Sequence, residues 1–206
     1  FENNTQKFMK PKPHSNPEAT VVKSLMELNE KKDFINLEKR IDEQLSLFPN
    51  SSLLHNLKGT ALSNLNRLEE GIDSFNLALD NAENPEIIFN NLGVTQIKLN
   101  RAEDSIKNFN HAIESNPKYY QAHFNAATAY RKIGKMHEAI NSYNLALEIH
   151  PEYAKGLVYK SLSLKNLGNF EGSISAGKEA IRVQPNYGLA HRHLSSMQNY
   201  SNANNQ

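Results

Sequence analysis

The sequence predicts an all-α protein built from a run of stacked helical hairpins. Two observations support this fold class. Prolines recur every 34 residues at Pro117, Pro151 and Pro185, and Pro49 lies two such periods before Pro117. Small and aromatic residues also recur at fixed positions of the same 34-residue frame, whereas no alternation of polar and apolar residues predicts a strand. A period of this length indicates one supersecondary unit that is repeated along the chain.

The frame, with proline at position 32, divides the chain into five units at 18–51, 52–85, 86–119, 120–153 and 154–187. Position 8 is small in four units: Gly59, Gly93, Ala127 and Ser161. Position 20 follows the same rule: Gly71, Ser105, Ala139 and Ser173. Position 24 is aromatic in three units: Phe75, Phe109 and Tyr143. The first unit departs from this pattern, and we expect it to act as an N-terminal cap. The fifth has Gly177 in place of the aromatic residue, so we expect it to pack less tightly than the central three units.

Within each unit, the apolar and small positions predict two antiparallel helices. Positions 4, 7, 8 and 11 form one helical face, and positions 17, 20, 21, 24, 27 and 28 form a second. Small residues let the two backbones approach closely while the aromatic residue fills the space beside them. Position 15 is Asn66, Asn100, Gly134 or Gly168, and these residues tolerate the positive φ that ends a helix. The following proline ends the second helix.

The segments on either side of the repeats differ from them in composition. Residues 1–17 contain Pro11, Pro13 and Pro17 among polar residues, which predicts a linker; the alternative is that Phe1 and Phe8 occupy a groove. Residues 188–200 predict one further helix that caps the stack. Residues 201–206 are small and polar, which predicts a disordered tail.

Composition excludes several classes of function. The net charge of +1 gives no electrostatic reason to expect nucleic acid or anionic lipid as a partner. The chain has no cysteine, and its apolar runs are too short to cross a membrane, so a cytoplasmic protein is expected. No catalytic motif, metal-ligand cluster or cofactor-binding loop is present, so we expect no enzymatic activity and no cofactor in these residues. Because Phe1 is not an initiator methionine, a preceding segment is expected.

The repeated residues resemble the tetratricopeptide repeat. The resemblance rests on Asn91-Leu92-Gly93 in one unit and on Ala139, Tyr143, Ala146 and Pro151 in the next. It implies a right-handed superhelical solenoid of about five helix-turn-helix units. It also implies a protein–protein interaction scaffold, in which the first helices line a concave groove that binds a peptide or a partner protein.

Groove positions implied by the resemblance give the candidate binding residues: Asn56, Asn90, Asn91, Phe124, Asn125, Thr128, Arg131, Lys155, Tyr159 and Lys165. Amides such as Asn91 and Asn125 can pair with the backbone of an extended peptide. Phe124 and Tyr159 are candidate apolar anchors, and the three basic residues are candidates for binding an acidic group. The alternatives are a solvated surface for the amides and charges, and packing between helices for the aromatic residues.

Two further possibilities remain open from the sequence. The segment Ala190 to Ser195 resembles the junction in bacterial repeat proteins that continue into a sulfotransferase domain, and similar arrays precede glycosyltransferase domains. The chain would then be the recruiting region of a larger transferase whose catalytic domain lies elsewhere. Self-association through the ends of the solenoid is the second possibility, because a loosely capped end can stack on another copy.

Overall fold

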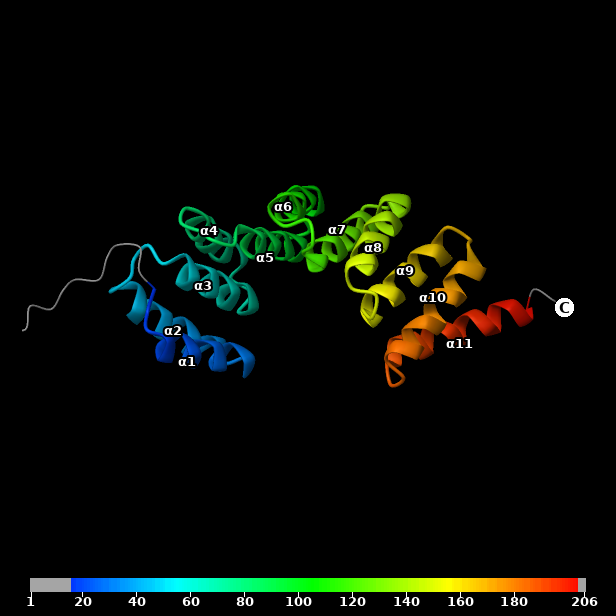
Figure 1. The fold of residues 1–206 in the computed structure, drawn as a ribbon, viewed down its shortest axis with the longest axis horizontal. Helices are drawn as coiled ribbons and strands as arrows, with labels where there is room; N and C mark the ends of the chain where they lie inside the picture. The colour runs from blue at the N-terminus through cyan, green and yellow to red at the C-terminus, as the bar shows by residue number, and fades with distance from the viewer. Residues whose placement is uncertain (1–15, 204–206) are drawn as a thin grey trace, which may run out of the picture. The chain divides into compact units, whose positions relative to one another are not determined.

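The computed structural model describes residues 16–203, and over this range the chain is all-α, as predicted, with no strand (Figure 1). The helices follow one another along the chain in pairs: α1 (Ala19–Glu30) and α2 (Phe34–Leu45), α3 (Ser52–Asn64) and α4 (Leu68–Leu79), α5 (Pro85–Lys98) and α6 (Ala102–Ser115), α7 (Tyr120–Lys132) and α8 (Met136–Ile149), and α9 (Ala154–Asn166) and α10 (Phe170–Val183), followed by α11 (Gly188–Ala203). The fold is that of a helical-hairpin solenoid.

The chain divides into two compact units, with the boundary between Thr95 and Gln96 inside α5. The predicted linker at 1–17 lies outside the described residues except for Asn16 and Pro17. The predicted tail at 201–206 is described only to Ala203, where α11 ends, so this helix runs beyond the expected boundary at residue 200.

The turns inside the hairpins have the predicted conformation. Asn66 and Asn100 have φ of 64° and 60°, and Gly134 and Gly168 have φ of 79° and 76°. The same position of the first hairpin is Lys32, with φ of 59°. The sequence pattern missed it because lysine carries no preference for left-handed backbone; the hairpin geometry imposes the conformation there.

The core of the first unit is built on close approach of helices. Leu25, Leu37, Ile41 and Leu54 are fully buried and join α1, α2 and α3. Between α3 and α4, a Cβ added at Gly59 would lie 2.7 Å from ring carbons of Phe75, which is 1% exposed. The small residue at position 8 therefore faces the aromatic residue at position 24, which explains why the two positions recur together.

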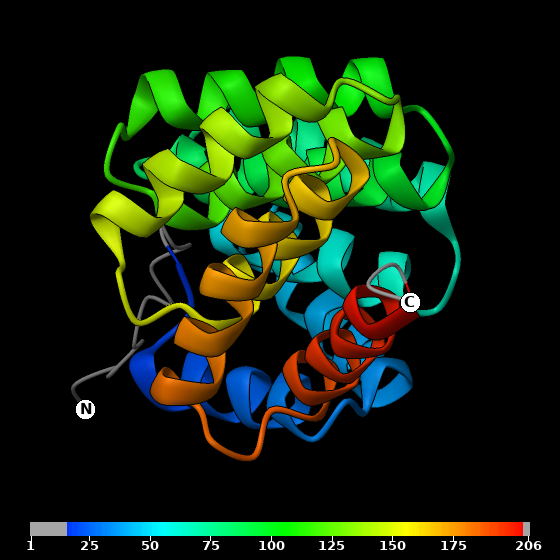
Figure 2. The ribbon, with the colours of Figure 1, turned by 90° about the vertical axis from the view of Figure 1, so that its right-hand side faces the viewer.

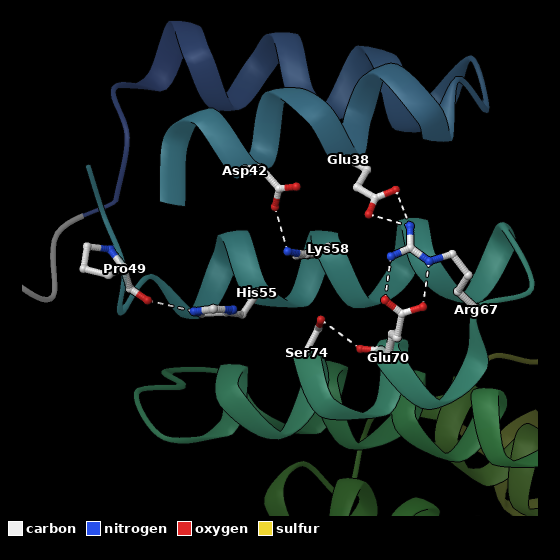
Figure 3. Close-up of polar contacts among 8 residues, drawn as sticks. All are labelled: Glu38, Asp42, Pro49, His55, Lys58, Arg67, Glu70 and Ser74. Carbon is white, nitrogen blue, oxygen red and sulfur yellow. Dashed lines mark hydrogen bonds and ion pairs between the residues drawn. The ribbon is translucent and has the colours of Figure 1, made fainter. Parts of the chain in front are cut away.

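Exposed ion pairs connect α2 to α3 and to the start of α4 (Figure 3). The Arg67 guanidinium donates to both oxygens of Glu38 at 2.7 and 2.8 Å, and it also donates to Glu70. Lys58 Nζ donates to Asp42 Oδ1 at 2.7 Å. Hydrogen bonding from Arg67 holds the pKa of Glu70 below its ordinary value. Because at least one partner of each pair is largely exposed to solvent, these ion pairs contribute little to stability.

The core of the second unit contains aromatic and small residues, whereas large aliphatic residues join α1, α2 and α3 in the first unit. Phe124, Ala127, Ala139, Tyr143 and Ala146 form the buried cluster between α7 and α8. A separate cluster joins α9, α10 and α11: Leu157, Val158, Ala180 and Ala190. Figure 2 shows α11, in red, beside α10, in orange, and the two helices are in contact.

Gly177, which lacks the aromatic side chain of earlier units, lies directly against α11. A Cβ added there would be 2.9 Å from Leu194 Cδ2. The space expected to weaken the fifth hairpin is therefore occupied by a side chain of α11.

A buried polar chain also links this helix to the hairpin. Ser161 Oγ donates to the Ser173 carbonyl at 2.5 Å, and Ser173 Oγ lies 3.0 Å from His193 Nε2.

Three histidines at the fourth position of the frame make the same contact. His55, His123 and His191 each place Nε2 within 2.6–2.9 Å of the carbonyl oxygen of the proline six residues earlier. Figure 3 shows the first of these contacts, between His55 and Pro49. Since a carbonyl only accepts hydrogen bonds, each Nε2 carries the proton. These histidines hold the start of a first helix to the turn before it.

Candidate functional site

The first unit contains a cavity of about 400 Å³ at the N-terminal ends of α3 and α5. Its lining is rich in primary amides: Asn16, Asn50, Asn56, Asn81 and Asn84. Glu83 is its charged residue, and Leu53, Ile87 and Ile88 supply apolar walls. We call this cavity the amide pocket. Amides offer donors and acceptors together, so the pocket can satisfy the polar groups of a peptide backbone while its walls contact aliphatic groups.

The sequence predicted only part of the amide pocket. Asn56 was a candidate groove residue, but Asn50, Asn81, Glu83 and Asn84 belong to the turns between hairpins. Asparagine is frequent around these turns, but it is common in turns of many proteins, so the sequence alone does not identify these asparagines as pocket residues. Only the folded chain brings the two turns together at one cavity.

The candidate amides Asn56 and Asn91 contact each other. Asn91 Nδ2 donates to Asn56 Oδ1 at 3.0 Å, from α5 to α3. One donor and one acceptor are thereby used, so a ligand would meet a paired amide surface. Asn90, another candidate, is 7% exposed and does not offer an open surface.

In the second unit, aromatic rings from α7, α8 and α9 form one cluster. The Phe124 ring centroid lies 5.6 Å from that of Tyr143, 5.5 Å from Tyr159 and 5.1 Å from Tyr153. Burial, with smaller effects from neighbouring tyrosines, raises the pKa of Tyr153 to about 12. Phe124 is only 4% exposed, so it packs inside the cluster and does not present the anchor surface that the sequence predicted.

Tyr159, by contrast, is half-buried and carries two cations beside its ring. Arg131 Cζ, from α7, lies 5.3 Å from the Tyr159 ring centroid. Lys155 Nζ, from the first turn of α9, lies 5.9 Å from the same centroid and 5.0 Å from that of Phe124. Aromatic faces attract cations, so the rings hold both charges in place. We call Arg131, Lys155 and Tyr159 the cation site.

The cation site has no counter-charge among the described residues, where no carboxylate forms an ion pair with Arg131 or Lys155. The Nε of Arg131 is buried and lacks a hydrogen-bond partner there. A buried donor without an acceptor is costly.

The remaining candidate residues of the second unit have internal contacts. Thr128 Oγ1 donates to the Phe124 carbonyl at 3.0 Å and lies 3.2 Å from the Tyr143 hydroxyl. Burial raises the pKa of Tyr143, against the opposing effects of Thr128 and Arg131. Thr128 is partly buried, and its hydroxyl contacts Phe124 and Tyr143.

Lys165, another candidate, lies away from the cation site and near α11. Its charge, added to the larger effect of burial, lowers the pKa of His193. Asn125 is partly buried on α7. The structure therefore brings together Arg131, Lys155 and Tyr159, and it separates Lys165 from them.

The residues that resembled a transferase junction also have structural roles. Ala190 is fully buried against the last hairpin, and His193 is 5% exposed and hydrogen-bonded to Ser173. Among residues 16–203, no three His, Asp or Glu side chains are grouped so as to hold a metal ion. No helix of that range is long and apolar enough to span a bilayer.

Comparison with known families defines the class. Residues 54–85 and 90–154 match two models of the tetratricopeptide repeat. These residues therefore contain tetratricopeptide repeats, as the sequence resemblance predicted, and repeats of this class support a role as a protein–protein interaction scaffold. No curated protein matches the sequence.

Solved structures share the fold at low identity. YrrB, described as a TPR protein with an unusual peptide-binding site, is 19% identical with a TM-score of 0.65, over 85% of this chain and 91% of that chain. MamA is 18% identical with a TM-score of 0.68, over 77% and 93%. A MamA fragment from Desulfovibrio magneticus is 12% identical with a TM-score of 0.70, over 82% and 96%. At these identities the likeness concerns the fold.

Proposed function

We propose that this chain is a non-catalytic scaffold that binds a peptide segment of a partner protein, and that the cation site binds an acidic group of that peptide. The observation that supports this is the presence of two cations around one half-buried ring, with no carboxylate among the described residues paired to either. Asn125, on the same helix as Arg131, is proposed to pair with the peptide backbone. YrrB, which shares the fold, is described as having a peptide-binding site.

Binding of a carboxylate fits the energetics of the cation site. The Tyr159 ring already orients both cations, so little side-chain entropy remains to be lost when an anion binds. A carboxylate between them would also accept a hydrogen bond from the guanidinium, and charge-assisted bonds of this kind are about twice as strong as neutral ones. The apolar cluster beneath lowers the local dielectric and strengthens the attraction.

A pair of matched peptides tests the proposal. One fluorescent decapeptide of Gly, Ser and Leu ends in Asp-Glu with a free carboxylate, and the other ends in Asn-Gln with an amide. We expect the full chain to bind the acidic peptide at least tenfold more tightly in fluorescence anisotropy. In the double variant Arg131→Met and Lys155→Met, this preference should fall below threefold.

The control removes the same charge elsewhere in the second unit. Lys118 and Lys178 are exposed and lie outside the cation site, so Lys118→Met with Lys178→Met should retain the preference. An equal loss in the control would show that net charge, and not the cation site, selects the peptide. Equal affinity of the unmodified chain for both peptides would refute the proposal.

A further inference from the structure

The amide pocket contains a carboxylate, and no lysine or arginine of the described chain lines it. Glu83 is exposed there, and no basic side chain among residues 16–203 forms an ion pair with it. The nearby cations are already engaged, because Lys58 and Arg67 each pair with a carboxylate of α2 (Figure 3). The described part of the chain therefore leaves the charge of the pocket to be matched by a ligand.

Hydrogen bonds within the protein fix which groups two of the pocket amides present. Asn16 Oδ1 accepts from Ser51 Oγ at 2.6 Å, and Ser51 Oγ in turn accepts from the backbone N–H of Leu54 at 3.2 Å. Asn56 Oδ1 accepts from Asn91 Nδ2 at 3.0 Å. In both amides the oxygen is engaged, so each offers its Nδ2 donors to a ligand. Such donors suit the carbonyl oxygens of an extended peptide backbone.

The turn amides add acceptors beside the carboxylate. Asn50, from the turn before α3, and Asn81 and Asn84, from the turn before α5, are exposed and line the same cavity as Glu83. A guanidinium has five N–H donors in one plane, so it can pair with a carboxylate through two of them and with amide oxygens through the others. A lysine ammonium has three donors and acts as a point charge. The polar lining thus fits arginine better than lysine.

The apolar walls of the pocket fit the rest of an arginine side chain. Leu53, Ile87 and Ile88 supply these walls, and Ile87 is 41% exposed although its side chain is aliphatic. Arginine buries its methylene groups along such surfaces while its charged end stays among polar groups. The volume of about 400 Å³ lies within the range of roughly 300–1,000 Å³ that is usual for ligand pockets.

We propose that the amide pocket binds an arginine side chain from an extended segment of a partner protein. The guanidinium pairs with Glu83 and the turn amides, and backbone carbonyls of the segment accept from Asn16 and Asn56. This inference goes beyond the proposed function, which concerns an acidic group in the second unit. It holds or fails independently of the cation site.

Three matched peptides test the inference on the full chain. Each is a nonapeptide of Gly and Ser with one central residue, and both ends are blocked so that no other charge is present. The central residue is arginine, lysine or citrulline, whose urea group has the shape of a guanidinium without its charge. In isothermal titration calorimetry, we expect the arginine peptide to bind at least fivefold more tightly than the citrulline peptide and at least twofold more tightly than the lysine peptide.

Substitutions in the pocket assign these preferences to particular groups. Glu83→Gln should reduce the preference for arginine over citrulline below twofold, because it removes the charge and keeps the shape of the side chain. Glu30→Gln is the matched control, since Glu30 is an exposed acid at the end of α1 outside the pocket. Asn81→Ala should reduce the preference for arginine over lysine, whereas Asn76→Ala, at an exposed position of α4, should not.

Equal affinity for the arginine and citrulline peptides, or for the arginine and lysine peptides, would overturn the inference. So would the absence of binding, or an equal loss of preference in Glu30→Gln, which would show that net charge alone attracts the peptide. The preference for arginine over citrulline should also shrink when NaCl is raised from 20 to 500 mM, because salt screens the attraction to Glu83. These peptides carry no acidic group, so failure of the cation site to bind the acidic decapeptide would leave the results unchanged.

Discussion

At the scale of single residues, the turn of each hairpin needs a residue with positive φ, and only some of the residues at that position favour this conformation. Gly134 and Gly168 adopt positive φ at no steric cost, and Asn66 and Asn100 tolerate it. Lys32 adopts φ of 59° at the same place without either advantage. The first hairpin therefore contains a local strain that the later hairpins avoid.

Replacing Lys32 with glycine should stabilise the protein. Left-handed backbone costs an ordinary residue roughly 1–2 kcal/mol, of which part is offset by the greater freedom of glycine in the unfolded chain. We expect Lys32→Gly to raise the free energy of unfolding by about 0.5–1 kcal/mol in urea titrations. Lys31→Gly is the matched control, because Lys31 has φ of −71° and gains nothing from glycine. A stabilisation of the same size in both variants would contradict the argument.

Gly59 packs against Phe75, so we predict that replacing this glycine destabilises the protein. Alanine has a better helix propensity than glycine by about 1 kcal/mol, but its Cβ at position 59 would lie 2.7 Å from the Phe75 ring. Since overpacking a rigid core costs about 1–3 kcal/mol, Gly59→Ala should lower the melting temperature. A Cβ added at Gly188 would meet no atom within 4 Å, so Gly188→Ala should leave the melting temperature unchanged or raise it. Equal effects of the two substitutions would disprove the packing explanation.

Among the helices, α11 is attached to the last hairpin by both apolar and polar contacts. Leu194 covers Gly177, and His193 accepts or donates a hydrogen bond with Ser173 in a site that is only 5% exposed. Burial, with a smaller effect from Lys165, lowers the pKa of His193 below its usual 6.5. Its neutral form therefore belongs to the docked state of the helix.

This lowered pKa gives a pH dependence with a definite sign. Above pH 6.5, His193 is mainly neutral in both folded and unfolded chains, and its full contribution to stability is present. As the pH falls below 6.5, the unfolded chain takes up a proton that the folded chain resists, so stability is lost until the folded pKa is passed. We expect thermal melts between pH 7.5 and 5.0 to show a larger loss for the unmodified chain than for His193→Gln, which keeps a hydrogen-bonding group without titrating.

Lys165→Met tests the electrostatic contribution to the lowered pKa of His193. Removing this charge should raise the pKa of His193 and reduce the loss of stability, while His193→Gln should be insensitive to the second substitution. The explanation fails if all four chains lose the same stability over this pH range.

Across the molecule as a whole, the candidate sites of the two units carry opposite charges. The amide pocket has Glu83 as its charged lining residue, whereas the cation site has Arg131 and Lys155. The net charge of +1 conceals this division, because residues after Ile97 contain thirteen basic and eight acidic side chains while the charged residues of 68–97 are all acidic.

The division predicts that the two sites respond independently. Glu83→Gln should leave the affinity for the acidic decapeptide within twofold of the unmodified value, whereas the Arg131 and Lys155 substitutions should weaken it. Titration of each variant with this peptide by fluorescence anisotropy checks this. A cross-effect larger than fivefold would show that the sites are coupled.

The fold class, the helical hairpins and the turn residues could all be predicted from the sequence, because each depends on local periodicity and on conformations that Gly, Asn and Pro favour. Arg131, Lys155 and Tyr159 were also candidates at that level. Which candidates meet is a property of the folded chain. Phe124 is buried in packing, Lys165 acts on the pKa of His193, and the turns around Asn50 and Asn84 line one pocket. A 34-residue repeat fixes where each side chain lies within its own hairpin, whereas burial and pairing depend on the neighbouring hairpin.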